Sequence, residues 1–319
     1  MNSIGLTYLL KMGCVCGRES LRINDRRFIV RSRLGEGGFS YVDLIEDARS
    51  HRTYALKRIT CHSKDEERTA MQEVELMKTF KHTNLIPLEV STMVQVDKYT
   101  KTLDIISEVL IVMPCYSKGS AQDIMERLVK KSDKLPEQRI WEIFLGLCQG
   151  LKVMHKHNPP YAHRDIKPAN VMLSDDGQAI LMDLGSAAKA RVEISTPSIG
   201  RALQDEAAER CSMLYRAPEL FNAEVGTTVD ERTDIWSLGC TLYALAFLES
   251  PFDRAYQRGD SIALAVLSGN VKFPENSGYS GGIQEIILRL MKPSAAERPF
   301  IDEVLQLVQT NAYSSDNRV

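Results

Sequence analysis

The sequence "YAHRDIKPAN" at Tyr161–Asn170 carries the strongest signal in this chain of 319 residues, and "VMLSDDGQAILMDLG" follows it directly. Asp165 lies five residues before Asn170 and eighteen before Asp183, a spacing typical of phosphotransferase catalytic loops. Phosphoryl transfer needs a carboxylate that orients the attacking hydroxyl and accepts its proton, which we assign to Asp165. Oxygen ligands for Mg²⁺, or for Mn²⁺ in its place, would come from Asn170 and Asp183. Lys167 can neutralise charge that develops on the transferred group.

A glycine-rich hairpin stands upstream, where "LGEGGFSYV" lies between two short β-like runs. Because glycine has no side chain, the backbone amides of Gly35, Gly37 and Gly38 can approach the phosphates of a nucleotide. On its own, such a stretch is more often a plain turn.

A lysine and a glutamate follow the hairpin. Lys57 lies in the apolar run "YALKRI", and Glu73 lies in the helical pattern "QEVELMK". Alone, Lys57 would be a solvated charge at a strand edge and Glu73 a surface carboxylate. Together with the Asp165 motif, they fit the strand-to-helix ion pair that holds a lysine against the α- and β-phosphates of ATP.

The hydrophobic pattern divides the chain into two parts. Short β-like runs between Phe28 and Ile59, a helical stretch at 66–80, and further strands at 86–96 and 108–113 predict a small antiparallel sheet with one helix. Long helices are expected afterwards at 139–157, 234–248, 261–269, 282–292 and 301–310. The predicted fold class is therefore α+β with two lobes. The expected divisions are an N-terminal segment at 1–27, an N-lobe at 28–114, a C-lobe at 115–312 and a tail at 313–319.

Composition excludes several other classes of protein. Hydrophobic residues make up 44% of the chain, enough to bury a full core. A net charge of -2 gives no field that would gather nucleic acid. Seven cysteines without metal-ligand spacing argue against a disulfide framework or a zinc site and favour the reducing cytosol. The apolar run at Ile4–Leu10 is too short and too interrupted for a membrane span or a signal peptide.

These motifs together resemble the eukaryotic protein kinases, and Lys167 in "DIKPAN" resembles their serine/threonine group. The resemblance runs from about 28 to about 309 and includes the docking segment "CSMLYRAPE" and the buried helix "DIWSLG". It implies the two-lobed kinase fold, with Asp234 bracing the catalytic loop. It also implies an ion pair between Arg298 and Glu219.

The same resemblance implies an ATP pocket. Met113 would be its gatekeeper, and backbone groups of Pro114 and Tyr116 would flank the hydrogen bonds to adenine. Ser40 replaces the usual third glycine of the loop. Core packing would explain the apolar members equally well. The residues assigned to nucleotide binding are Leu34, Gly35, Gly37, Gly38, Ser40, Val42, Ala55, Lys57, Met113, Pro114, Tyr116 and Leu173.

A helix-like stretch, "IGRALQDEAAERC" at Ile199–Cys211, lies in the long segment between Asp183 and Glu219. With "LGEGGFSYVDL", "YALKRI" and "DLGS", it resembles the Numb-associated kinase family, and within it the branch that carries myristoyl and palmitoyl chains. This implies an extra helix in the activation segment that is ordered without phosphorylation. His163 would then be a packed structural residue and Arg164 a clamp on the segment, able to pair with a phosphate. The candidate phosphorylation and docking residues are Ser195, Thr196, Ser198 and Ser212.

The stretch "MGCVCGRES" looks like the beginning of a protein, although eleven residues precede its Met12. If translation began at Met12, Gly13 would become an acceptor for N-myristoylation. The resemblance then makes Cys14 and Cys16 palmitoylated residues. Gly17 departs from the Ser or Thr preferred at its position. We expect the preceding residues to be a gene-model extension or an alternative isoform; the alternative is a flexible N-terminus with two inert cysteines.

Two classes of function follow. The first is a Mg·ATP-dependent serine/threonine protein kinase, monomeric, acting on protein substrates and peripheral on Golgi or other cytosolic membrane faces if acylated. The second is a membrane-attached scaffold of kinase fold with little catalytic activity. Lys57, Glu73, Asp165, Asn170 and Asp183 are all present, which favours the kinase.

Overall fold

The computed structural model describes residues 19–37, 40–96, 104–275 and 278–316. The predicted acylation residues Gly13, Cys14 and Cys16 and the predicted loop residue Gly38 lie outside this part of the chain.

The chain divides into two compact units. The N-terminal unit holds the described residues up to Lys81 together with Ile86–Cys115. The C-terminal unit holds His82–Leu85 and the residues from Tyr116 onward. A four-residue piece of the loop after the first helix therefore belongs with the later, mainly helical part of the chain.

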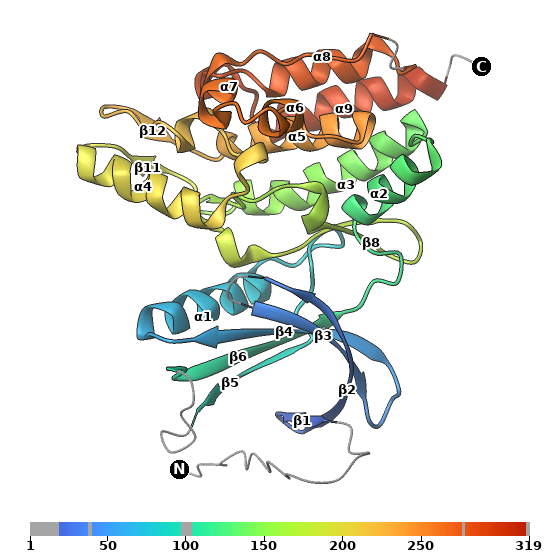
Figure 1. The fold of residues 1–319 in the computed structure, drawn as a ribbon, viewed down its shortest axis with the longest axis vertical. Helices are drawn as coiled ribbons and strands as arrows, with labels where there is room; N and C mark the ends of the chain where they lie inside the picture. The colour runs from blue at the N-terminus through green and yellow to red at the C-terminus, as the bar shows by residue number, and fades with distance from the viewer. Residues whose placement is uncertain (1–18, 38–39, 97–103, 276–277, 317–319) are drawn as a thin grey trace. The chain divides into compact units, whose positions relative to one another are not determined.

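The N-terminal unit is an antiparallel sheet with one helix packed beside it (Figure 1). Its elements are β1 (Ser20–Ile23), β2 (Arg26–Glu36), β3 (Ser40–Asp47), β4 (Thr53–Cys61), α1 (Lys64–Thr79), β5 (Val90–Gln95) and β6 (Ser107–Pro114). The strand order is β1–β2–β3–β4–β6–β5, and α1 packs against β4 and β6. The predicted sheet and helix are confirmed, and α1 begins two residues before the predicted stretch because Ser63 caps it.

Strand β1 lies outside the predicted sheet, because the β-like runs that the hydrophobic pattern indicates begin only at Phe28. It forms a hairpin with β2 and buries Leu21 and Ile23 in the sheet core with Phe28. Exposed and buried residues alternate along "SLRI", and Asn24 turns the chain with a φ of 52°. Alternation before a turn residue is the signal that identifies this hairpin.

The C-terminal unit is mainly helical (Figure 1). Its helices are α2 (Ala121–Lys131), α3 (Glu137–His155), α4 (Pro197–Arg210), α5 (Arg232–Phe247), α6 (Asp253–Gln257), α7 (Ile262–Ser268), α8 (Gly281–Leu290) and α9 (Ile301–Asp316). Short strands form two-residue or three-residue ladders: β7 (Tyr161–Ala162) with β10 (Ala188–Lys189), β8 (Val171–Leu173) with β9 (Ala179–Leu181), and β11 (Val192–Glu193) with β12 (Thr228–Val229). Single 3₁₀ turns occur at Pro168–Asn170, Leu184–Ser186, Met213–Tyr215, Pro218–Leu220 and Ala295–Glu297.

Helix α5 is the centre of this unit. Every residue from Thr233 to Ala246 is buried, and α5 contacts both α3 and α8, which confirms the sequence prediction of a buried helix. Helix α9 continues to Asp316 and so enters the predicted tail at 313–319. Within the described chain, no helix combines the length and apolarity needed to cross a membrane.

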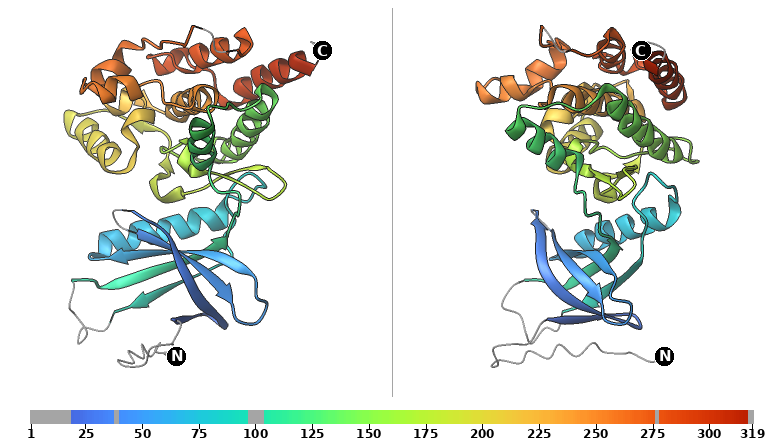
Figure 2. Two further views of the ribbon diagram at one scale, coloured as in Figure 1. Left: turned by 45° about the vertical axis from the view of Figure 1, so that its right-hand side comes forward. Right: turned by 90° about the vertical axis from the view of Figure 1, so that its right-hand side faces the viewer.

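The predicted helix of the activation segment is present as α4, which starts two residues earlier than expected at Pro197. In Figure 2 it lies at one side of the helical unit, close to the β11–β12 ladder. Leu203 and Ala207 pack with Ile194 and Leu220 in a small apolar cluster. Tertiary packing, as well as helix propensity, therefore holds α4 in place.

The segment His82–Leu85 is bound to the C-terminal unit through Asn84. Its side-chain nitrogen donates to the carbonyl of Ala179 at 2.7 Å, and its carbonyl accepts from the N–H of Leu181 at 2.9 Å. A side chain at Gly150 of α3 would place its Cβ only 2.6 Å from the Asn84 carbonyl oxygen. The glycine is required there because α3 and the segment approach so closely.

We expect Gly150→Ala to destabilise the protein by about 1 to 3 kcal/mol, because the added methyl group must push aside the carbonyl that holds Leu181. Urea unfolding followed by circular dichroism measures this. Gly281→Ala at the start of α8 is the matched control, since a Cβ there meets nothing within 4 Å. Equal stability of the two variants would contradict the close approach of Asn84 to α3.

Candidate active site

Lys57 and Glu73 form an ion pair within the N-terminal unit. Lys57 lies on β4 and Glu73 on α1, and the lysine Nζ is 2.8 Å from Oε1 and 2.9 Å from Oε2 of the glutamate. Only 14% and 5% of the two side chains are exposed. A charge buried to this degree is stable only when it is paired. The predicted pair therefore forms, and it links the helix to the sheet.

The glycine-rich hairpin joins β2 to β3, and the N–H of Gly37 donates to the carbonyl of Ser40 at 2.7 Å. A Cβ at Gly35 would meet nothing within 4 Å, and one at Gly37 would lie 3.6 Å from the nearest atom. Packing among the residues that the structure describes therefore does not require glycine at these two positions. Leu34, at the same hairpin, is 50% exposed.

The other residues predicted for nucleotide binding in the N-terminal unit lie on neighbouring strands. Ala55 on β4 is paired directly with Met113 on β6, and both are buried. Val42 on β3 is paired with Lys57 and is half-buried. Pro114 is the last residue of β6. The sheet register thus places Val42, Ala55 and Met113 on the same face as the predicted lysine, whereas Pro114 is paired with Tyr54.

Two predicted residues belong to the C-terminal unit. Leu173 is buried on β8, and Tyr116 is the first residue of the unit after the sheet. Burial raises the pKa of the Tyr116 hydroxyl above its ordinary value, so the side chain is neutral at physiological pH.

One buried carboxylate holds the backbone of the catalytic loop. The Asp234 side chain, in the first turn of α5, accepts from the N–H of His163 at 2.7 Å and from the N–H of Arg164 at 2.8 Å. Nε2 of His155 lies 2.9 Å from the same carboxylate. Burial by itself would raise the pKa of Asp234, but the hydrogen bond from His155 and the other donors hold it below the ordinary range. The predicted bracing contact is therefore present.

The carboxylate of Asp165 is held by three donors. Its Oδ1 accepts from the N–H of Ser212 at 2.8 Å. Its Oδ2 accepts from Nζ of Lys167 at 2.7 Å and from Nδ2 of Asn170 at 3.0 Å. Lys167 also donates to the Ser212 hydroxyl at 2.6 Å. The structure thus brings three predicted residues, Lys167, Asn170 and Ser212, within hydrogen-bonding distance of the Asp165 carboxylate.

Asn170 and Asp183 are brought close by the backbone between them. The side-chain nitrogen of Asn170 also donates to the carbonyl of Asp165 at 2.8 Å, which fixes the orientation of the amide. The N–H of Met182 donates to the carbonyl of Asn170 at 2.9 Å, and Asp183 is the next residue. Asp183 has a φ of 66°, a conformation uncommon outside glycine. His163, fully buried as predicted, lies 3.0 Å from the Met182 carbonyl through Nε2.

Arg164 contacts the activation segment as predicted, but through a residue that the sequence analysis does not name. Its guanidinium lies 3.2 Å from the carboxylate of Glu206 on α4 and 3.3 Å from the carbonyl of Lys189. Glu206 lies three residues after the buried Leu203, at the edge of the buried face of the helix, and this spacing is the signal in the sequence for its role.

The predicted phosphorylation residues lie elsewhere on the segment. Ser195, Thr196 and Ser198 are exposed near the start of α4, and the Thr196 hydroxyl accepts from the N–H of Ile199 as the helix cap. Arg164 is therefore paired with Glu206, and not with any of these three hydroxyl-bearing residues.

Arg298 and Glu219 form the ion pair expected from the resemblance. Both nitrogens of the guanidinium fork lie 2.7 Å from a carboxylate oxygen. The same guanidinium donates to the carbonyls of Lys292, Pro293 and Arg232. All donors of a fully buried arginine side chain are thus paired, and they tie the end of the activation segment to α5 and to the loop after α8.

We expect Asp234→Asn to destabilise the protein by about 3 to 5 kcal/mol at pH 7. The carboxylate accepts with both of its oxygens, whereas an amide has one accepting oxygen, and its NH₂ group would face a donor. The folded pKa of Asp234 lies below its ordinary value of about 3.9. The contribution is therefore fully present above about pH 4 and is lost as the pH falls through the folded pKa. Denaturant unfolding between pH 3 and pH 8 measures both effects.

The matched control is Asp205→Asn, which changes an exposed carboxylate on α4. Its unfolding free energy is expected to stay within about 0.5 kcal/mol of the wild type. A loss in Asp234→Asn no larger than in the control, or one that grows as the pH falls below 4, would contradict the assignment.

Known proteins are similar in sequence to this chain. The model of the protein kinase domain family matches residues 28–308. Serine/threonine-protein kinase 16 of Homo sapiens is 38% identical over 296 residues, which cover 93% of this chain and 94% of that protein. Serine/threonine-protein kinase ENV7 of Saccharomyces cerevisiae is 30% identical over 366 aligned positions, covering 97% and 99%. The chain therefore belongs to the protein kinase family and is a serine/threonine protein kinase, as its sequence resemblance predicts.

Proposed function

We propose that Asp165 is the catalytic residue that orients the substrate hydroxyl and accepts its proton while the γ-phosphate of ATP is transferred to it. The arrangement of donors around this carboxylate carries the proposal. One donor holds Oδ1 and two hold Oδ2, so the group has a fixed orientation. A carboxylate oxygen can accept two hydrogen bonds, which leaves Oδ1 able to accept one from a serine or threonine hydroxyl.

Lys167 has two effects at this site. Its ammonium group donates to the Asp165 carboxylate at 2.7 Å and helps to hold that group in one orientation. The same charge stabilises negative charge on the transferred phosphoryl oxygens. Because Lys167 also donates to Ser212, it connects the catalytic loop with the docking segment that follows α4.

Protein kinases use ATP with a divalent cation, and we propose Mg²⁺ here, with Mn²⁺ as a substitute. The side-chain oxygen of Asn170 and the carboxylate of Asp183 would hold the cation. These are hard oxygen donors, and the Asn170 amide is turned by its nitrogen contacts to Asp165 so that the oxygen is the free end. When bound, the cation neutralises charge on the phosphates.

For the nucleotide we assign Lys57 to the α- and β-phosphates, with Glu73 as the residue that positions it. Among the described residues nothing packs closely against Gly35 and Gly37, and this open space supports the approach of phosphates to the hairpin. The remaining assignments are Leu34, Gly38, Ser40, Val42, Ala55, Met113 and Pro114 from the N-terminal unit and Tyr116 and Leu173 from the C-terminal unit.

The test is transfer from [γ-³²P]ATP to a basic protein substrate by the full chain, with phosphoamino-acid analysis of the product. We expect Asp165→Asn to lower kcat about 10²-fold or more, because general base catalysis contributes that much. Asp183→Asn is expected to abolish Mg²⁺-dependent transfer, because it removes a carboxylate that would hold the cation. Phosphoserine and phosphothreonine should be the products.

Asp205→Asn is again the matched control, and its rate should equal that of the wild type. A wild-type rate no higher than that of Asp183→Asn, with nucleotide still bound, would reject transfer and support the scaffold. Equal rates in Asp165→Asn and the wild type would reject Asp165 as the base.

We also propose that the form of this kinase that starts at Met12 is attached to cytosolic membrane faces, such as the Golgi, by acylation. The sequence from Met12 supports this, since Gly13 follows a methionine and two cysteines stand nearby. A single myristoyl chain binds bilayers only marginally, so palmitate on Cys14 or Cys16 would make the attachment stable. A kinase attached in this way would meet protein substrates at the same membranes.

In cells fed an alkyne analogue of myristate, we expect the chain that starts at Met12 to be labelled and Gly13→Ala to be unlabelled and found in the soluble fraction. Cys14→Ser with Cys16→Ser should keep the label but lose stable membrane binding. Labelling of the Gly13→Ala variant, or intact masses that show only unacylated chains starting at Met1, would reject the proposal.

A further inference from the structure

Five arginines gather at one end of the N-terminal sheet. They lie where the β1–β2 and β3–β4 connections meet, and the N–H of Ala48 donates to the carbonyl of one of them at 2.9 Å. Four of them line an open hollow with a volume of about 840 Å³. We call this region the arginine surface; it consists of Arg22, Arg26, Arg27, Arg49 and Arg52.

Only Arg26 of this surface has a structural role in the unit. Its guanidinium donates to Asp47 at 2.9 Å and to Glu89 at 2.6 Å. The other oxygen of Asp47 accepts from the N–H groups of Ser50 and Arg49, each at 2.9 Å, and these bonds hold the pKa of Asp47 well below its usual range. The buried carboxylate of this region is thus fully engaged in the fold.

The other four arginine side chains are exposed and form no ion pair within the described chain. Arg22 and Arg27 stand directly opposite each other in the β1–β2 register. Two like charges at such a position destabilise a hairpin, so folding does not account for them. The formal charge of the whole chain is -2, which makes this positive region a local feature.

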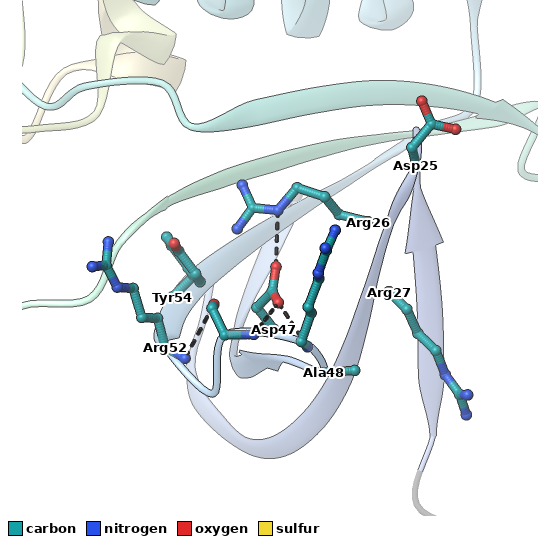
Figure 3. Close-up of a pocket in the computed structure, with 9 residues that line it drawn as sticks. Asp25, Arg26, Arg27, Asp47, Ala48, Arg52 and Tyr54 are labelled. Carbon is teal, nitrogen blue, oxygen red and sulfur yellow. Dashed lines mark hydrogen bonds and ion pairs between the residues drawn. The ribbon is translucent and has the colours of Figure 1, made fainter.

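The directions of the side chains indicate the kind of partner. In Figure 3, the side chains of Arg27 and Arg52, which have no ion pair within the described chain, extend to opposite sides, so their guanidinium groups do not converge on one point. A site for one small anion would aim its donors at one point. Spread donors instead fit a broad negative surface with many separate anionic groups.

We propose that the arginine surface docks onto a bilayer leaflet rich in anionic phospholipid headgroups. The inference rests on the acylation proposed above. Ser20 follows Gly13 by seven positions in the sequence, and a chain of this length spans at most about 25 Å. An acyl chain on Gly13 would therefore keep β1 and its hairpin near the headgroups. A myristoyl chain with a basic patch is a stable combination of signals, where either one alone is weak.

The test uses the kinase that starts at Met12, myristoylated by co-expression with N-myristoyltransferase, in sedimentation with vesicles. Vesicles of phosphatidylcholine alone are compared with vesicles that contain 30% phosphatidylserine. The neutralised variant carries Arg22→Gln, Arg27→Gln, Arg49→Gln and Arg52→Gln. The control carries the same charge change at exposed lysines of the C-terminal unit, Lys130→Gln, Lys131→Gln, Lys272→Gln and Lys292→Gln.

We expect phosphatidylserine to increase wild-type binding at least tenfold, with the increase lost in the neutralised variant, retained in the control and suppressed by 0.5 M salt. Peptide phosphorylation in solution should be equal in all three proteins, since none of these residues belongs to the proposed active site.

Three results would overturn the proposal: no preference of the wild type for phosphatidylserine, equal loss in the control, or binding of a polyglutamate peptide through these arginines with vesicle binding unchanged. The last would assign the surface to an acidic protein. A Gly13→Ala variant separates the two proposals. If it is unmyristoylated but keeps a weak, arginine-dependent preference for phosphatidylserine vesicles, the surface binds lipid by itself; the acylation proposal fails separately, when cells show no myristate on Gly13.

Discussion

The carboxylate of Asp234 is the contact on which the geometry of the catalytic loop depends. It accepts from two consecutive backbone N–H groups, at His163 and Arg164, and Arg164 has a φ of 67° that a non-glycine residue adopts only under constraint. A buried carboxylate is stable only when it is fully hydrogen-bonded. The loop supplies donors that stabilise the buried charge of Asp234, and Asp234 in turn fixes the loop backbone. Asp234 lies in the first turn of α5, whose residues from Thr233 to Ala246 are all buried against neighbouring helices, so the carboxylate is shielded from water.

The conformation of the loop then directs the reactive groups. Once His163 and Arg164 are fixed, the next residue, Asp165, is placed where Ser212, Lys167 and Asn170 can all donate to it. The contact with Ser212 comes from a segment more than forty residues later in the chain. The catalytic loop and the docking segment therefore hold each other in position, and a change in either alters the carboxylate.

Paired charges hold the activation segment at three places. Arg164 meets Glu206 on α4, Arg191 meets Glu231 before α5, and Arg298 meets Glu219 at the end of the segment. Glu206 supplies a permanent carboxylate to an arginine that could otherwise pair with a phosphate. These pairs differ from the arginine surface of the N-terminal sheet, where four guanidinium groups have no carboxylate partner within the described chain. An arginine without a partner inside the fold is available to a partner outside it.

The sequence by itself determined the fold class, the protein kinase family and the residues around Asp165, because short motifs at fixed spacing and helical or alternating periodicity are local properties of a chain. It also located α4 and the Lys57–Glu73 pair. It did not determine β1, since "SLRI" is too short to stand out until Leu21 and Ile23 are seen in the sheet core. Nor did it determine the Asn84–Gly150 approach, the Arg164–Glu206 contact or the arginine surface. Each of these depends on residues that are distant in the chain and meet only when helices and strands pack, and that packing alone decides which charged side chains find a partner.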